Sequence, residues 1–225
     1  VAKNATAAFK ANEEKTLVLA KEIKDMINAL PSVAEFKKGE YNADQVKVMK
    51  QVVIADGENA SKIDQLVALY VTLGIVATAP TTAEGKIDAL VNGRKVLGDN
   101  PATTDTVETD YPVLDTKIGN FNGEGEKALL EKAFSLPGAY DEAEANKVIE
   151  TVELLPGAKL LSLENEAQVK AARTAYDALT DAQEAIANKY TSANYIKGKL
   201  EAAEEAILNL KKQQRTLPVE VAISA

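Results

Sequence analysis

The sequence contains no cysteine, no histidine and no tryptophan among its 225 residues. Without cysteine and histidine the chain cannot build zinc or haem sites from those side chains. It also lacks a thiol nucleophile and the side chain most often used for acid–base catalysis. No apolar run reaches the roughly 18 residues that a membrane-spanning helix needs. We therefore predict no enzymatic activity, no catalytic residues, no cofactor, no metal ligands and no membrane span.

Positive charge is the minority here, with 26 Lys and Arg against 34 Asp and Glu, and the formal net charge is −8. An acidic surface repels phosphate backbones, so nucleic acid is not expected as a partner. The apolar share of 46% falls in helical stripes, which argues against disorder. The chain starts at Val1 without an initiator Met or a signal peptide, which is typical of a processed or excised chain.

The stretch 148–212 has the clearest pattern. Apolar residues recur there, and just before it, at the spacing of one helical face. Thr180 and Gln183 have the spacing of a capping box, which starts a new helix. None of these helices can bury its stripe alone, so we predict a small antiparallel bundle. The striped positions are Ala145, Val148, Ile149, Val152 and Leu155, then Val169, Ala172, Tyr176 and Leu179, then Ala182, Ile186 and Tyr190, and finally Leu200, Ala203, Ile207 and Leu210.

Similar stripes occur earlier, over residues 9–30, 46–53, 63–73, 87–97 and 128–134. The hexapeptides that begin at Asn42 and Asn165 both place Asn at a helix cap, Gln three residues later and Val-Lys next. This match indicates an internal repeat. Leu136-Pro137-Gly138 is predicted to end the helix before it.

We predict an all-α fold of consecutive three-helix bundle units in an elongated array, in preference to a single irregular bundle. The units are 1–78, a degenerate unit 83–137, and 138–214. In the tail 215–225, apolar residues alternate with other residues at the period of a strand. We predict an extended linker there, or the first strand of a following immunoglobulin-like domain.

Two loops match ligand-binding motifs only in part. Gly119–Gly125 is rich in glycine, but no strand precedes it and no Lys-Ser/Thr pair follows, so an interhelical turn is favoured over a phosphate site. Asp99–Asp110 has the length of a calcium loop, but Thr104 stands where the tight turn requires glycine. Neither loop is assigned as a site.

Three polar or aromatic residues are candidate contacts for a glycan or another partner: Tyr190, Asn194 and Tyr195. Tyrosine rings can stack on the apolar faces of sugars, although packing at the core or its rim is the alternative for each ring. Tyr176 is predicted to be a core residue. Arg173 is predicted to lay its stem along the edge of the core and to pair with an acid.

Residues 155–210 resemble a known kind of module. The run from Val169 through Arg173, Tyr176 and Leu179 to Gln183, with the later run Leu200–Ile207, resembles FIVAR-type and related helical repeats of Gram-positive bacterial surface proteins. The insertion 190–195 departs from that pattern.

The resemblance implies an exported, extracellular segment of a cell-surface or cell-wall protein. Its expected role is that of a structural spacer or assembly segment, as in S-layer proteins or adhesins. Its expected partners are other surface-protein domains or cell-wall polymer. The alternative is a module that binds cell-wall polysaccharide or a host protein.

Overall fold

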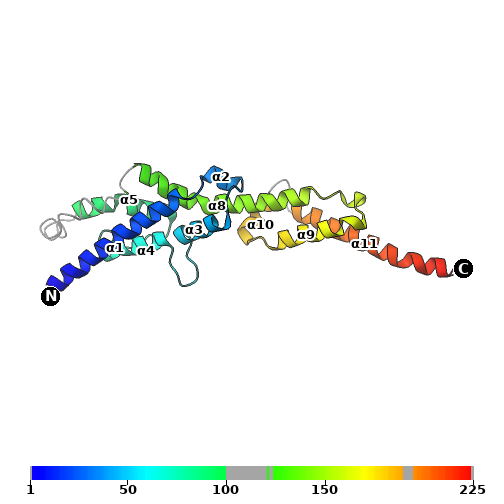
Figure 1. The fold of residues 1–225 in the computed structure, drawn as a ribbon, viewed down its shortest axis with the longest axis horizontal. Coiled ribbons are helices and arrows are strands. Elements are labelled where there is room, and N and C mark those ends of the chain that lie inside the picture. Colours follow the sequence, from blue (N-terminus) through cyan, green and yellow to red (C-terminus); the bar gives the residue numbers. More distant parts are fainter. Residues whose placement is uncertain (1, 100–120, 122–123, 190–194, 224–225) are drawn as a thin grey trace. The chain divides into compact units, whose positions relative to one another are not determined.

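A computed structural model describes the backbone of residues 2–99, 121, 124–189 and 195–223, and the side chains of 11–92, 121, 125–189 and 195–215. Throughout these residues the regular elements are helices, and no strand is present (Figure 1). The predicted all-α class is confirmed. The chain divides into two compact units, Val1–Ala139 and Tyr140–Ala225.

The first unit is built around three mutually packed helices, α1, α3 and α4, with α5 packed on α4 (Figure 1). Its largest fully buried side chains include Tyr70, Ile23, Ile63 and Leu90. The elements of this unit are α1 (Ala2–Asn28), α2 (Val33–Lys37), α3 (Ala43–Val53), α4 (Lys62–Thr72), α5 (Ala83–Asp99) and the beginning of α8 (Glu124–Glu153).

Helices α5 and α8 share the core of the first unit. Leu90 of α5 and Leu130 of α8 are fully buried in one cluster with residues of α1 and α4. Lys86 Nζ also lies 2.5 Å from Asp64 Oδ1, which joins α5 to the start of α4. A single amphipathic helix cannot bury its own stripe, so α5 depends on its neighbours for burial.

The observed division therefore differs from the three predicted units 1–78, 83–137 and 138–214. The predicted units 1–78 and 83–137 fall together in the first observed unit, which ends at Ala139. The second observed unit starts at Tyr140, close to the predicted start at residue 138. The elongated array of three-helix bundles stays a prediction.

Capping boxes start several helices, as the sequence predicts for two of them. The Asn42 side chain accepts a hydrogen bond from the backbone N–H of Gln45 at the start of α3. In the second unit, the Thr180 side chain accepts one from the backbone N–H of Gln183. Helix α2 lies outside the stripes predicted from the sequence, which pass from residues 9–30 to residues 46–53. Its signal was a third capping box, in which Ser32 and Glu35 bond each other's backbone.

Lys132 of α8 caps the end of α1. Its Nζ donates hydrogen bonds to the backbone oxygens of Ile27 and Leu30, at 3.0 and 2.7 Å. The last carbonyls of a helix have no partner within the helix, and a cation there also complements the helix dipole. Burial lowers the pKa of this amine, while Glu35 opposes that shift.

Helix α8 continues through Pro137, so the predicted helix end at Leu136-Pro137-Gly138 was wrong. A proline inside a helix removes one hydrogen bond and crowds the carbonyl four residues earlier, here that of Ala133. Leu136 is fully buried and Ala139 is 2% exposed. Packing on both sides of the proline therefore outweighs the local cost.

Replacing Pro137 with Ala is expected to raise the free energy of unfolding by about 2 kcal/mol. Proline costs about 3 kcal/mol in a helix interior, and about 1 kcal/mol of the gain is offset by the more flexible unfolded chain. Chemical denaturation measures the change. Pro156→Ala is the matched control, because Pro156 lies in the turn after α8 and its replacement should give no gain. A loss of stability in Pro137→Ala would show that the core requires a proline kink.

The second unit contains the end of α8, η2 (Ala158–Leu160), η3 (Leu163–Asn165), α9 (Glu166–Asp177), α10 (Asp181–Ala187) and α11 (Tyr195–Ile223). Helices α9 and α11 pack side by side (Figure 1). The core confirms the stripes predicted for α8, α9 and α11. The stripe predicted for α10 was wrong, because Ala182 is exposed and α10 buries Gln183 and Ala187 instead. The buried residues of the core are Val148, Val152, Leu155, Leu161, Val169, Ala172, Tyr176, Ile196, Leu200, Ala203 and Ile207.

Two other local predictions in this unit were wrong. Asn165 does not cap α9 with its side chain, because its Oδ1 accepts hydrogen bonds from the backbone N–H of Ser162, at 2.9 Å, and from the Ser162 hydroxyl. The predicted extended tail 215–225 is helical as far as Ile223. Leu210, Leu217 and Val221 also fit a helical spacing. Extending an existing helix adds one hydrogen bond per residue, except at Pro218, without a new nucleation cost.

We expect the buried phenol of Tyr70 to make the stability of the first unit depend on pH. The side chain is 1% exposed, and burial, reinforced by the charge of Glu126, raises the pKa of its phenol well above the ordinary value of 10. The unfolded chain loses this proton near pH 10 while the folded chain keeps it. Stability is therefore fully present below pH 10, and it is expected to fall by up to about 1.4 kcal/mol per pH unit above it.

Denaturation midpoints at pH 9 and pH 11 test this effect in the wild type and in Tyr70→Phe. The variant should lose less stability between the two pH values, because Phe carries no proton. Equal losses in both proteins would show that Tyr70 does not titrate in this way.

Candidate functional site

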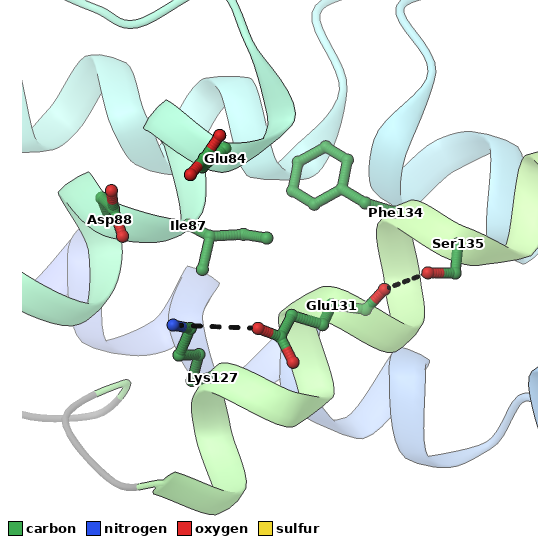
Figure 2. Close-up of a pocket in the computed structure, with 7 residues that line it drawn as sticks. All are labelled: Glu84, Ile87, Asp88, Lys127, Glu131, Phe134 and Ser135. Carbon is green, nitrogen blue, oxygen red and sulfur yellow. Dashed lines mark hydrogen bonds and ion pairs between the residues drawn. The ribbon is translucent and has the colours of Figure 1, made fainter.

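A groove lies between α5 and α8 in the first unit, with a volume of about 360 Å³. Figure 2 shows side chains from both helices around it. Those from α5 are Glu84, Ile87 and Asp88, and those from α8 are Lys127, Glu131, Phe134 and Ser135.

The floor of the groove is apolar. Ile87 is 8% exposed and belongs to the core, and Phe134 packs against the same core while keeping part of its ring accessible. These two side chains come from different helices, so the groove exists only because α5 and α8 share one core.

The rim of the groove is charged and mostly acidic. Glu84 and Asp88 lie four residues apart on α5, so both fall on one side of the helix. Lys127 and Glu131 have the same spacing on α8, and Ser135 follows one turn later. Three carboxylates and one ammonium group thus surround an apolar floor.

Lys127, the one basic side chain among the lining residues, forms only a weak ion pair. Lys127 Nζ lies 3.9 Å from Glu131 Oε1, and about half of each side chain is exposed, so this pair contributes little to stability. Ser135 donates its hydroxyl to the Glu131 backbone oxygen at 2.8 Å. The carboxylates of Glu84 and Asp88 make no hydrogen bond or ion pair with the described side chains. Both carboxylates face solvent.

A second polar cluster surrounds Tyr176 in the second unit. Arg173 donates two hydrogen bonds of 2.8 Å to the Glu204 carboxylate, and its guanidinium carbon lies 5.6 Å from the centre of the Tyr176 ring. The predicted pairing of Arg173 with an acid is confirmed. The two hydrogen bonds to Glu204 raise the pKa of Arg173 further above its ordinary value.

The Tyr176 hydroxyl donates to Glu184 Oε1 at 2.8 Å and accepts from Asn188 Nδ2 at 2.9 Å. Its ring is 5% exposed, which confirms the predicted core position. Burial raises the pKa of the phenol, although the Asn188 hydrogen bond opposes this shift. A buried, neutral phenol held by hydrogen bonds joins α9 to α10, and it is not poised as a base or a nucleophile.

The predicted contact residues are only partly described. Tyr195 is the first residue of α11 and is 44% exposed. Tyr190 and Asn194 lie outside the described residues, as do Asp99–Asp110 beyond its first residue and most of Gly119–Gly125. The glycan contact therefore stays a prediction.

Among the described residues, no group of three or more acidic side chains could hold a metal ion. Nor is any helix in that part of the chain long and apolar enough to cross a membrane.

Sequence reasoning missed the groove. One part of it was visible in the sequence: Glu84 and Asp88 share one side of a helix with the apolar residue Ile87. The missing information was the pairing of α5 with α8, which brings together residues about 40 positions apart in the sequence.

Comparisons with known proteins add no family to this description. No family model matches the sequence, and neither a curated protein nor a solved structure matches it.

Proposed function

We propose that the chain is a structural spacer or assembly segment of an exported bacterial cell-surface protein, of the S-layer or adhesin type. The observation that carries this proposal is α8. One helix of 30 residues contributes Leu130 and Ala133 to the core of the first unit and Val148 and Val152 to the core of the second. The chain thus passes from one core to the next within a helix, which suits a segment whose task is to connect and support other domains.

The extracellular location rests on the resemblance of residues 155–210 to helical repeats of Gram-positive surface proteins. The composition is compatible with it, since an excess of acidic over basic residues limits association with nucleic acid.

Protease treatment of intact cells tests the location. Brief digestion should release peptides from this chain before the cells lyse, in step with a known surface protein. Release only after lysis would contradict a surface location.

Domain replacement tests the spacer role. An unrelated helical bundle of similar length should restore the activity of the parent protein when it replaces residues 1–225. Failure of that replacement, together with full activity of the natural protein, would favour a binding role.

A binding module for cell-wall polysaccharide or a host protein is the second candidate, favoured by the exposed ring of Tyr195. Calorimetry with purified wall polymer tests the polysaccharide form of this candidate. Binding that Tyr195→Ala weakens would support it, whereas no heat at millimolar ligand would contradict it.

A further inference from the structure

The groove between α5 and α8 combines two properties that select one kind of occupant. Its floor, formed by Ile87 and Phe134, leaves apolar surface accessible beside the core of the first unit. Its volume of about 360 Å³ is at the lower end of the range for ligand pockets. A space of this size suits one or two side chains.

The negative charge of the rim favours a positively charged ligand group. Glu84, Asp88 and Glu131 exceed Lys127 by two negative charges. Glu84 and Asp88 make no ion pair with the described part of the chain, and the Lys127–Glu131 pair is loose and exposed. A cation that enters the groove therefore displaces no strong ion pair made by the residues that the structure describes.

We propose that this groove docks a lysine- or arginine-bearing segment of a partner protein. The aliphatic stem of the docked side chain lies on Ile87 and Phe134, and its charged head lies at the acidic rim of the groove. Long basic side chains bury their stems on apolar surface while the head stays solvated, and the Phe134 ring adds a cation–π attraction. This inference goes beyond the spacer role and does not depend on it.

A protein segment fits the groove better than a basic saccharide does. A sugar needs several directed hydrogen bonds to its hydroxyls in addition to an aromatic face. The lining offers only one neutral polar side chain, Ser135, and its hydroxyl already donates to the Glu131 backbone. A lysine stem needs only apolar contact along its length and carboxylates at its end.

The direct test titrates a capped penta-lysine peptide into the isotope-labelled full chain at low ionic strength, where surface charge pairs are least screened. The amide signals of α5 and α8 around Ile87 and Phe134 are expected to shift and to saturate. The double variant Glu84→Gln/Asp88→Asn should weaken binding by about four- to twenty-fivefold, since each exposed charge pair contributes a factor of about two to five. Lys127→Gln should strengthen binding by about two- to fivefold for the same reason.

The matched control is Glu201→Gln/Glu205→Gln on α11. It removes the same total charge from two exposed carboxylates with the same spacing, and it should leave the affinity for penta-lysine unchanged. Unfolding midpoints of both double variants confirm that each one folds.

The role of the apolar floor is tested by changing the peptide, because a substitution at Ile87 or Phe134 could unfold the protein. Capped penta-ornithine has the same charge, but each stem is one methylene shorter. It should bind up to about fourfold more weakly for each docked side chain.

Three results would overturn the inference. The control variant could weaken binding as much as the groove variant, which would indicate non-specific attraction. Penta-ornithine could bind as tightly as penta-lysine, which would exclude a role for the floor. A chitosan oligomer could shift the same amides at lower concentration, which would make the groove a site for a basic saccharide.

Discussion

Replacing Tyr176 with Ala is expected to lower the free energy of unfolding of the second unit by about 3–5 kcal/mol. The ring is 5% exposed and packs in the core with Val169 and Ala172 of α9. The substitution removes that packing and also the hydroxyl that bonds Glu184 and Asn188. Denaturation followed through the amide protection of α9 and α11 measures the loss in this unit alone.

Two further variants separate the contributions in this experiment. Tyr176→Phe keeps the ring and should cost about 1–2 kcal/mol for the lost hydrogen bonds. Tyr195→Ala changes a ring that is 44% exposed and should stay within about 0.5 kcal/mol of the wild type. If Tyr176→Ala cost less than about 1 kcal/mol, the side chain would lie at the surface and a role in ligand binding would have to be considered.

A loss of about 2–5 kcal/mol is expected in the first unit when Leu90 is replaced with Ala. Leu90 is fully buried, and it lies in one core cluster with Ile23 of α1 and Leu66 of α4. Because the core is shared, amide protection should fall in α1 and α4 as well as in α5. Hydrogen exchange of the whole chain resolves these helices separately.

The same experiment decides how the first unit is divided. If α5 belonged to an independent unit over residues 83–137, Leu90→Ala would reduce protection in α5 and α8 and leave α1 and α4 unchanged. Asn92→Ala, one half-turn away on the exposed side of α5, is the control and should change stability by less than about 0.5 kcal/mol.

The parts of the fold that depend on neighbouring residues were predictable from the sequence. Val169, Ala172 and Tyr176 repeat at helical spacing, and the structure buries all three. Thr180 and Gln183 form the capping box that their spacing predicts. Both signals lie within one or two helical turns, where geometry follows directly from sequence.

The parts that depend on distant residues were not predictable in this way. Local propensity ends a helix at Pro137, but burial of Leu136 and Ala139 on either side holds α8 intact. The alternation in the tail fits a strand, yet it also continues the stripe of α11. The groove needs Ile87 and Phe134 to meet through a shared core, which no local pattern encodes.

The hydrogen bonds from Lys132 to the end of α1 also bear on how the chain folds during its synthesis. They join residues 102 and 105 positions apart. At an elongation rate of about 5–20 residues per second, roughly 5–20 s pass between the addition of Leu30 and that of Lys132. Over that interval, the Ile27 and Leu30 carbonyls lack the Lys132 amine, and the apolar faces of α1 and α4 lack Leu130 and Ala133. The first unit of a nascent chain therefore stays incomplete until α8 has emerged from the ribosome.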